Sequence, residues 1–248
     1  PTYFDGAFIS YDFAKYFNIS AFGGTFEKKD FYGATLGTSF IKGFYILSKE
    51  KDFDLSTFGA ALNIERESFA FNFLATFNSG TERKEILGIP FEEKYKGKMF
   101  EGDIKFKKQN EDFYSEFSIG AQYLSPTKDD TFGFRPLSAN LDRGFIFGNL
   151  TEELETLTYK LSLKVIPQII KDLTAGVDIY NFTATDKRKT NRDIAREIDF
   201  NLIYKWEHFS AKFIYGYLQA QNAFSDFATG LEPKPTINKL GLILSYQF

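Results

Sequence analysis

Cysteine is absent from the 248 residues, which excludes disulfides, thiol nucleophiles and thiolate metal sites. Long apolar runs are missing as well, and none approaches the roughly 18 residues that a membrane-spanning helix needs. The sequence has no glycine-rich phosphate-binding loop, so we expect no cofactor. The formal net charge of −3 favours neither nucleic acid nor an anionic bilayer surface as a partner.

Aromatic residues, in contrast, are abundant. The chain has 31 phenylalanines and 14 tyrosines, yet its mean hydropathy is −0.27. This combination suits strands in which apolar and polar residues alternate. In residues 157–165, for example, apolar side chains fall on one face, and Thr158, Lys160, Ser162 and Lys164 fall on the other. We find no long segment with helical spacing of three and four residues, so the pattern predicts an all-β protein.

Two-faced strands fit either a soluble β-sandwich or a transmembrane β-barrel. The alternating runs of roughly 9–13 residues favour the barrel, because sandwich strands average about 5–6 residues. The apolar faces begin and end with aromatic residues, as in an aromatic girdle. Tight turns also alternate with long polar loops, one of them expected over residues 78–97. We therefore predict a single transmembrane antiparallel up-and-down β-barrel domain over residues 1–248.

The alternation predicts about 12–14 strands in this chain. Their expected ranges are 4–13, 16–27, 31–41, 43–50, 53–65, 68–79, 93–107, 112–124, 156–166, 172–184, 193–206, 208–219 and 237–248. A bacterial single-chain barrel normally has an even number of strands, so a count of thirteen allows two interpretations. Either residues 31–50 form one strand, or the chain is the C-terminal part of a longer barrel and strand 4–13 lacks a partner on one edge.

The last predicted strand alternates apolar residues and stops on Phe248. Such an ending resembles the C-terminal signature of bacterial outer-membrane proteins, which the insertion machinery recognises. We therefore expect localisation in the outer membrane of a Gram-negative bacterium. The expected partners are outer-membrane lipid and lipopolysaccharide, and the barrel-assembly machinery, which would bind the Phe248 strand.

Several segments run in the order found in the alginate-export family of outer-membrane porins. The segments "TFGFRPL" and "RGFIFG" and the late strand with Glu197 and Asp199 are most similar to that family. The resemblance implies a monomeric barrel of about eighteen strands that passes polar or anionic solutes, with more sequence before the "FDG" segment than this chain has. Alginate itself needs a strongly basic lumen, whereas the polar faces of these strands mix both charges.

These polar faces supply the candidate pore-lining residues. They are Lys160, Lys164, Lys205, Lys212, Lys239, Glu101, Asp103, Glu116, Asp178, Glu197 and Asp199. The pairs Glu101/Asp103 and Glu197/Asp199 have i, i+2 spacing, so both carboxylates lie on one strand face. We expect them to form charge ladders with lysines of neighbouring strands. Acid–base chemistry and cation binding are the alternatives.

The single histidine, His208, lies in the tight turn "WEHF". Outer-membrane proteases and phospholipases generally need a catalytic histidine, and we interpret His208 as an interfacial turn residue instead. We therefore expect neither enzymatic activity nor a metal site.

The longest predicted loop, 125–155, combines acidic residues with Arg135, Arg143 and four phenylalanines. Because exposed phenylalanines would leave apolar surface in water, we predict that this loop folds inward. Arg135 and Arg143 would then face lumen carboxylates and, together with the lysines, determine selectivity. An ordinary exposed loop is the alternative.

The sequence thus predicts a porin for passive diffusion of small polar or charged solutes. Two other functions remain open. One is a plugged barrel that acts as a surface binding, adhesion or structural protein, and the other is a soluble β-sandwich or lipocalin-like carrier.

Overall fold

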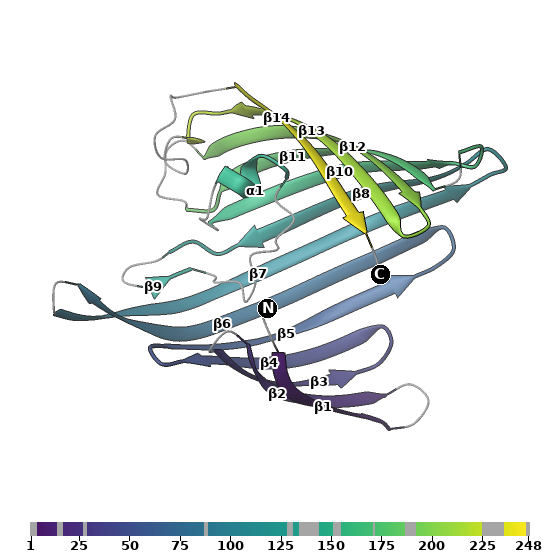
Figure 1. Cartoon of the computed structure of the whole chain (residues 1–248). Coiled ribbons are helices and arrows are strands. Elements are labelled where there is room, and N and C mark those ends of the chain that lie inside the picture. The colour runs from purple at the N-terminus through teal and green to yellow at the C-terminus, as the bar shows by residue number, and fades with distance from the viewer. Residues whose placement is uncertain are drawn as a thin grey trace. The chain divides into compact units, whose positions relative to one another are not determined.

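A computed structural model gives the structure of the chain (Figure 1). It describes residues 4–13, 17–26, 29–86, 89–127, 131–133, 144–150, 155–170, 172–186, 192–224 and 236–246. These residues form strands and one helix of four residues, α1 (Phe147–Leu150). Within the described ranges, no helix has the length and apolarity to span a membrane.

Thirteen strands pair with their neighbours in sequence order, as an antiparallel up-and-down sheet. A two-residue strand, β9 (Thr131–Phe132), pairs in parallel with β7. The other strands are β1 (Phe4–Asp12), β2 (Asn18–Phe26), β3 (Lys29–Gly37), β4 (Ile41–Glu50), β5 (Phe53–Glu65), β6 (Phe69–Ile86), β7 (Ile89–Gln109), β8 (Phe113–Leu124), β10 (Thr156–Pro167), β11 (Leu173–Ala184), β12 (Asp193–Trp206), β13 (Phe209–Ala220) and β14 (Thr236–Tyr246).

The expected all-β class and the number of strands are confirmed. In the sheet order of the described strands β1 comes first and pairs with β2, and β14 comes last and pairs with β13. Phe248 lies outside the described residues. Backbone contacts divide the chain into two compact units, which we describe separately.

The first unit comprises Pro1–Ile64, Asn72–Gly102 and Tyr123–Ala139. Rings from successive strands contact one another along one face of its sheet, with Phe58 stacked on Phe77 at 5.3 Å and Phe77 at 5.7 Å from Phe100. Such cross-strand aromatic pairs stabilise strand pairing beyond the area that they bury.

Residues 31–50 form two strands, as expected, so the interpretation that merges them into one strand is wrong. The chain reverses at residues 38–40, where the Thr38 hydroxyl accepts a hydrogen bond from the backbone N–H of Ile41 at 3.1 Å. A second bond at 2.7 Å, from the N–H of Thr38 to the Ile41 carbonyl, closes the turn. Local bonds of this kind let Thr favour a turn within a sequence that otherwise alternates.

The long loop expected over 78–97 is also a wrong prediction, because β6 and β7 continue through this region as a hairpin. Charged and hydroxyl groups pair across its strands: Lys84 lies 2.7 Å from Glu93, and the Tyr95 hydroxyl donates to Glu82 at 2.6 Å and to Glu93 at 2.8 Å. The hydrogen bond from Lys84 lowers the pKa of the Glu93 carboxyl. With polar residues on both faces, the sequence of this hairpin has the composition of a loop.

The hairpin extends past the neighbouring strand β5. The backbone N–H of Arg83 donates to the carbonyl of Asp52, the residue just before β5 begins. Residues 84–86 and 89–94 lie beyond this bond, and we interpret them as the part of the hairpin that projects beyond the bilayer.

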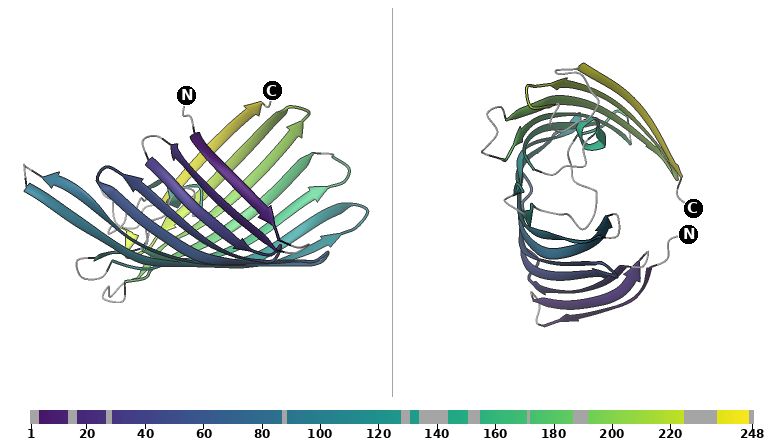
Figure 2. Two further views of the ribbon diagram at one scale, coloured as in Figure 1. Left: turned by 90° about the horizontal axis from the view of Figure 1, so that it is seen from below. Right: turned by 90° about the vertical axis from the view of Figure 1, so that its left-hand side faces the viewer.

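The second unit comprises Glu65–Phe71, Asp103–Gln122 and Asn140–Phe248. Its strands β10–β14 pair in register over almost their full length, with one bulge between β11 and β12 at Ile194. The tight turn at His208 is confirmed, because only two residues separate β12 from β13. These strands curve around α1, which lies on their concave side (Figure 2).

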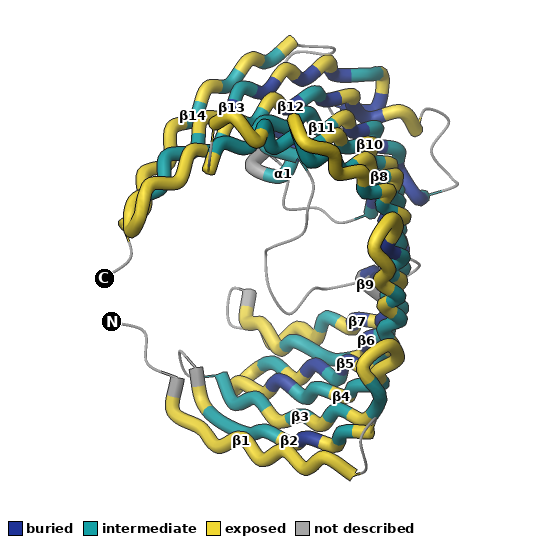
Figure 3. The backbone as a smooth tube through the Cα atoms, turned by 90° about the vertical axis from the view of Figure 1, so that its right-hand side faces the viewer, coloured by how far each residue is buried: buried dark blue, intermediate teal, exposed yellow. Residues whose placement is uncertain are grey.

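We call the concave face of β10–β14 the inner face and the opposite face the outer face. Along these strands exposed residues alternate with less exposed ones (Figure 3). The exposed residues on the outer face are largely apolar. Its exposed side chains include Leu161, Leu163, Ile179, Phe200, Leu202, Phe213, Leu240 and Leu242. Large apolar residues exposed at every second position are typical of a strand that faces lipid.

Candidate functional site: an inner-face cavity beneath an inserted turn

A short turn, residues 144–147, lies against the inner face of the second unit. It begins at Gly144, whose φ of +79° is a left-handed conformation that side-chain-bearing residues rarely adopt. The next three residues direct their backbone N–H groups towards β12, and α1 follows from Phe147. This part of the 125–155 loop therefore folds inward as predicted.

Two carboxylates of β12 hold the turn. The N–H of Phe145 donates to Asp199 Oδ2 at 2.8 Å, and the N–H groups of Ile146 and Phe147 donate to Glu197 Oε1 at 2.5 Å and Oε2 at 2.9 Å. Glu197 is fully buried and Asp199 nearly so. Three consecutive backbone N–H groups thus bind two side chains of one strand, and together they hold the turn against β12.

Glycines provide the space that the turn occupies. A Cβ on Gly216 of β13 would lie 3.0 Å from Ile146 Cγ1 and 2.8 Å from Asp199 Oδ1. A Cβ on Gly241 of β14 would lie 2.7 Å from the Phe145 ring. Real Cβ atoms do not approach other atoms so closely, so the turn needs small residues at both positions of the sheet.

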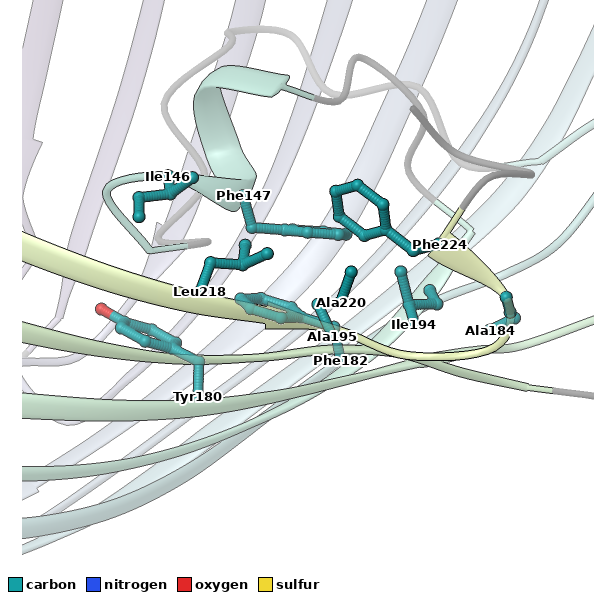
Figure 4. Close-up of a cluster of buried hydrophobic side chains, with 11 residues drawn as sticks. Ile146, Phe147, Tyr180, Phe182, Ala184, Ile194, Ala195, Leu218, Ala220 and Phe224 are labelled. Atoms are coloured by element: carbon teal, nitrogen blue, oxygen red, sulfur yellow. The ribbon is translucent and has the colours of Figure 1, made fainter. Parts of the chain in front are cut away.

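An apolar cluster anchors the other end of the turn. Phe147 is fully buried and stacks on Phe182 of β11 with ring centroids 4.0 Å apart. Figure 4 shows the Phe147 ring above Leu218 and Ala220 of β13, with Phe224 beside it. The cluster consists of Ile146, Phe147, Tyr180, Phe182, Ala184, Ile194, Ala195, Leu218, Ala220, Ala223 and Phe224. The inner face is therefore apolar where α1 packs and polar beyond it.

A cavity of about 540 Å³ lies on the polar part of the inner face, next to the turn. Its lining includes Gly144 and Phe145 of the turn and side chains from β10 to β13. The charged residues among them are Lys160, Lys164, Lys212, Asp178 and Asp199. Wall strands and an inserted turn thus enclose one polar space, which is large enough for a small solute.

The charges around this cavity are unequally compensated. Lys160 lies 3.4 Å from Asp178, which also accepts a hydrogen bond from the Asn201 amide at 3.0 Å. The ammonium of Lys160 also lies over the Tyr180 ring at 5.2 Å. Asp199 accepts the backbone N–H of Phe145. Both carboxylates are thus engaged with protein groups, and the lysines give the cavity a positive lining.

Lys239 of β14 lies just outside this lining, with its ammonium 4.5 Å from the centroid of the Phe145 ring. That distance is within the range of a cation–π contact. The turn therefore reaches across the inner face from β12 to β14.

Of the predicted site residues, five line the cavity, while Glu197 and Lys239 contact the turn beside it. Lys205 lies near the end of β12 and is exposed. Asp103 and Glu116 flank Lys105 at 3.9 and 4.0 Å, on β7 and β8 of the same unit. Glu101 belongs to the first unit, and Arg135 and Arg143 lie outside the described residues.

Lys105 pairs with Glu116 of the neighbouring strand but with Asp103 of its own strand β7, so the charge ladder expected at Glu101 and Asp103 stays a prediction. The ladder expected at Glu197 and Asp199 is wrong. Strand register places Tyr180 and Leu218 beside Glu197, and it places Asp178 and Gly216 beside Asp199. The carboxylates instead accept backbone N–H groups from a turn about fifty residues away in the sequence.

Sequence reasoning also missed Tyr180 and Asn201, which contact the charged groups of the cavity. Their positions on the polar face of alternating strands, in step with Asp178 and Asp199, are the signal that could have identified them. Among the described residues, no group of three or more His, Asp or Glu could hold a metal ion.

Comparison with known proteins identifies the fold. No protein-family profile and no curated sequence matches the chain. Solved structures do match: OpdO of Pseudomonas aeruginosa has a TM-score of 0.56 and 10% identity, over 98% of this chain and 68% of that one. OpdQ of the same organism has a TM-score of 0.58 and 12% identity, over 99% of this chain and 71% of that one. OpdK of this organism, solved with vanillate, has a TM-score of 0.55 and 9% identity, over 99% of this chain and 69% of that one.

The chain thus spans about 70% of the length of these proteins. They are OprD/Occ-type outer-membrane porins, and none of the three is described as an alginate exporter, so the resemblance to the alginate-export family stays a prediction. The identities are too low to show more than the fold. The similarity of structure shows that the chain has the transmembrane antiparallel up-and-down β-barrel fold of outer-membrane porins.

Proposed function

We propose that the protein is an outer-membrane channel for the passive diffusion of small polar or charged solutes. The observation that carries this proposal is the lysine-lined cavity on the inner face of strands whose outer face is apolar and exposed. A strand with one lipid-like face and one polar face fits a barrel wall with a hydrated lumen. The porin fold supports the same function.

The charge balance favours small anions. Asp178 is paired with Lys160, and Glu197 and Asp199 accept backbone N–H groups, whereas Lys164 and Lys212 line the cavity. Rings of charged side chains that line a pore select ions of the opposite sign. OpdK has been solved with vanillate, an aromatic carboxylate, and a solute of that class would suit a cavity lined by lysines and by the rings of Phe145 and Tyr180.

The remaining expectations belong to the same proposal. We place the protein in the outer membrane of a Gram-negative bacterium as one barrel domain in contact with lipid and lipopolysaccharide. We propose insertion by the barrel-assembly machinery through the Phe248 strand, and no enzymatic role. Kinship with alginate-export porins is supported by the sequence segments quoted above.

Conductance in planar bilayers tests the function. The reversal potential in a KCl gradient should show a preference for chloride over potassium. Replacing both cavity lysines (Lys164→Glu with Lys212→Glu) should reverse that preference. The control carries the same change of charge at two exposed positions that are not part of the cavity lining (Lys51→Glu with Lys94→Glu) and should keep the chloride preference. Equal shifts in both variants would contradict the assignment of this cavity to the solute path.

A second candidate is a plugged barrel that serves as a surface binding, adhesion or structural protein. The apolar cluster around Phe147 favours it, because this cluster fills part of the inner face with side chains. Protein that is folded and inserted but gives no conductance in the same bilayers would support the plugged barrel over the porin.

A further inference from the structure

The turn of residues 144–147 fills part of the inner face and also lies against the carboxyl groups of Glu197 and Asp199. We propose that the 144–147 turn determines the charge selectivity of the channel by sequestering Glu197 and Asp199 from permeating ions. This inference rests on the proposed channel function and assigns its specificity to one element.

The first step in the argument is the position of the two carboxylates. Their side chains point to the same face of β12 as Asn201, which lines the cavity, and Asp199 itself is part of that lining. Despite this, Glu197 is 0% exposed and Asp199 is 3% exposed. The turn contributes three N–H groups to them, so the backbone occupies the side from which an ion would approach.

The second step is electrostatic. Successive backbone N–H groups that converge on an anion form a concave anion-binding site, and their dipoles stabilise the negative charge. Both oxygens of Glu197 and Oδ2 of Asp199 are thus covered by backbone N–H donors of the turn. Of the charged residues near the cavity, only Asp178 then remains to offset the lysines in the described part of the site.

The third step is the charge balance without the turn. Lys160, Lys164 and Lys212 would face three carboxylates in an open cavity, and the positive excess would disappear. Charges in a narrow, poorly hydrated space interact far more strongly than they do in bulk water. Release of the turn should therefore change the preferred ion and not only the size of the pore.

Gly144 offers a specific way to release the turn. A Cβ at this position would lie 2.7 Å from Glu197 Oε2 and 2.8 Å from its Cδ, and the φ of +79° already disfavours any side chain. Gly144→Val should therefore undock residues 145–147 and leave every wall strand intact. The matched control is Gly43→Val on β4, where the nearest atoms to a new Cβ are carbonyl oxygens at 3.8 and 3.9 Å.

The experiment combines hydrogen exchange of the amides of residues 145–147 with reversal potentials in a KCl gradient. The wild type and Gly43→Val should protect these amides and prefer chloride. Gly144→Val should lose the protection, and its chloride-to-potassium permeability ratio should fall to one or below. Adding Glu197→Gln and Asp199→Asn to Gly144→Val should restore the chloride preference, because the uncovered carboxylates are then neutral.

Each outcome decides a separate point. If the wild type shows no conductance, the proposed channel function is refuted, and hydrogen exchange alone then tests whether the turn is docked. A channel whose Gly144→Val variant loses amide protection but keeps its selectivity overturns the inference. If Gly144→Val does not fold, Ile146→Pro removes the N–H that donates to Glu197 Oε1 and is judged by the same two measurements.

Discussion

Replacing Glu197 with glutamine changes one atom and the charge of the group that holds the inserted turn. The glutamate accepts two backbone N–H groups, one on each oxygen, from Ile146 and Phe147. In glutamine one of these oxygens becomes an NH₂ group, which donates and cannot accept. In either orientation of the amide, one backbone N–H of the turn then faces a donor.

The cost of this change follows from the backbone N–H that loses its acceptor. A buried hydrogen-bond donor left without a partner costs about 1–3 kcal/mol, so we expect docking of the turn to weaken by about that amount. At about 1.4 kcal/mol for each factor of ten, amide protection should fall roughly 5- to 140-fold.

Hydrogen exchange of the purified protein in detergent micelles, followed by mass spectrometry of peptides that contain residues 144–150, measures this effect. The matched control is Glu116→Gln, which neutralises a carboxylate beside Lys105 and Tyr114, away from the turn. The control should leave exchange in 144–150 unchanged. Unchanged protection in Glu197→Gln would refute the reasoning, because the carboxylate would then not be the group that retains the turn.

Three further predictions concern the wall, the cluster and the hairpin. Leu161→Arg on the outer face should destabilise the folded protein in lipid vesicles by about 2–4 kcal/mol in denaturant titrations, whereas Ser162→Arg should be tolerated; equal effects would contradict the assignment of the two faces. Phe147→Ala removes a fully buried ring, and we expect a loss of about 3–5 kcal/mol for docking of α1, read from exchange in this segment with the wall strands as internal reference. Because Lys84 lowers the pKa of Glu93, their contact stabilises the hairpin above the ordinary pKa of 4.5, and this contribution is lost as the pH falls through the lowered value. Exchange in residues 84–94, corrected for intrinsic rates, should rise at low pH in the wild type but not in Lys84→Gln.

The sequence predicts the wall strands well because alternation is a local property. In residues 157–165 the polar and apolar faces are those that the pattern indicates, and the turn at His208 follows from the same rule. The hairpin over β6 and β7 was missed because an apolar face marks a strand only where that face meets lipid or a core. In this hairpin, cross-strand pairs such as Lys84 with Glu93 stabilise the strands without such a face.

The site was predicted less well, and the reason is physical. Lysines on a polar strand face can be identified from sequence, and three of them do line the cavity. The partners of Glu197 and Asp199 are backbone N–H groups, which every residue except proline carries and which therefore leave no mark on the sequence. Gly216 matters because it has no side chain and so leaves space for Ile146. That role can be recognised only when the position of the turn against the sheet is known.

The separation in sequence between the turn and its acceptors has a consequence for the order of assembly. Ile146 and the Glu197 that binds it are 51 residues apart, and β10 and β11 lie between them. Joining residues so far apart costs the conformational entropy of the intervening chain, and this cost is smaller once that chain is already folded. We therefore expect the turn to dock after β11, β12 and β13 are paired and Gly216 stands opposite Asp199. Maturation of the channel would then end with this insertion, and a wall that is complete but newly made would pass ions with a different preference from the finished protein.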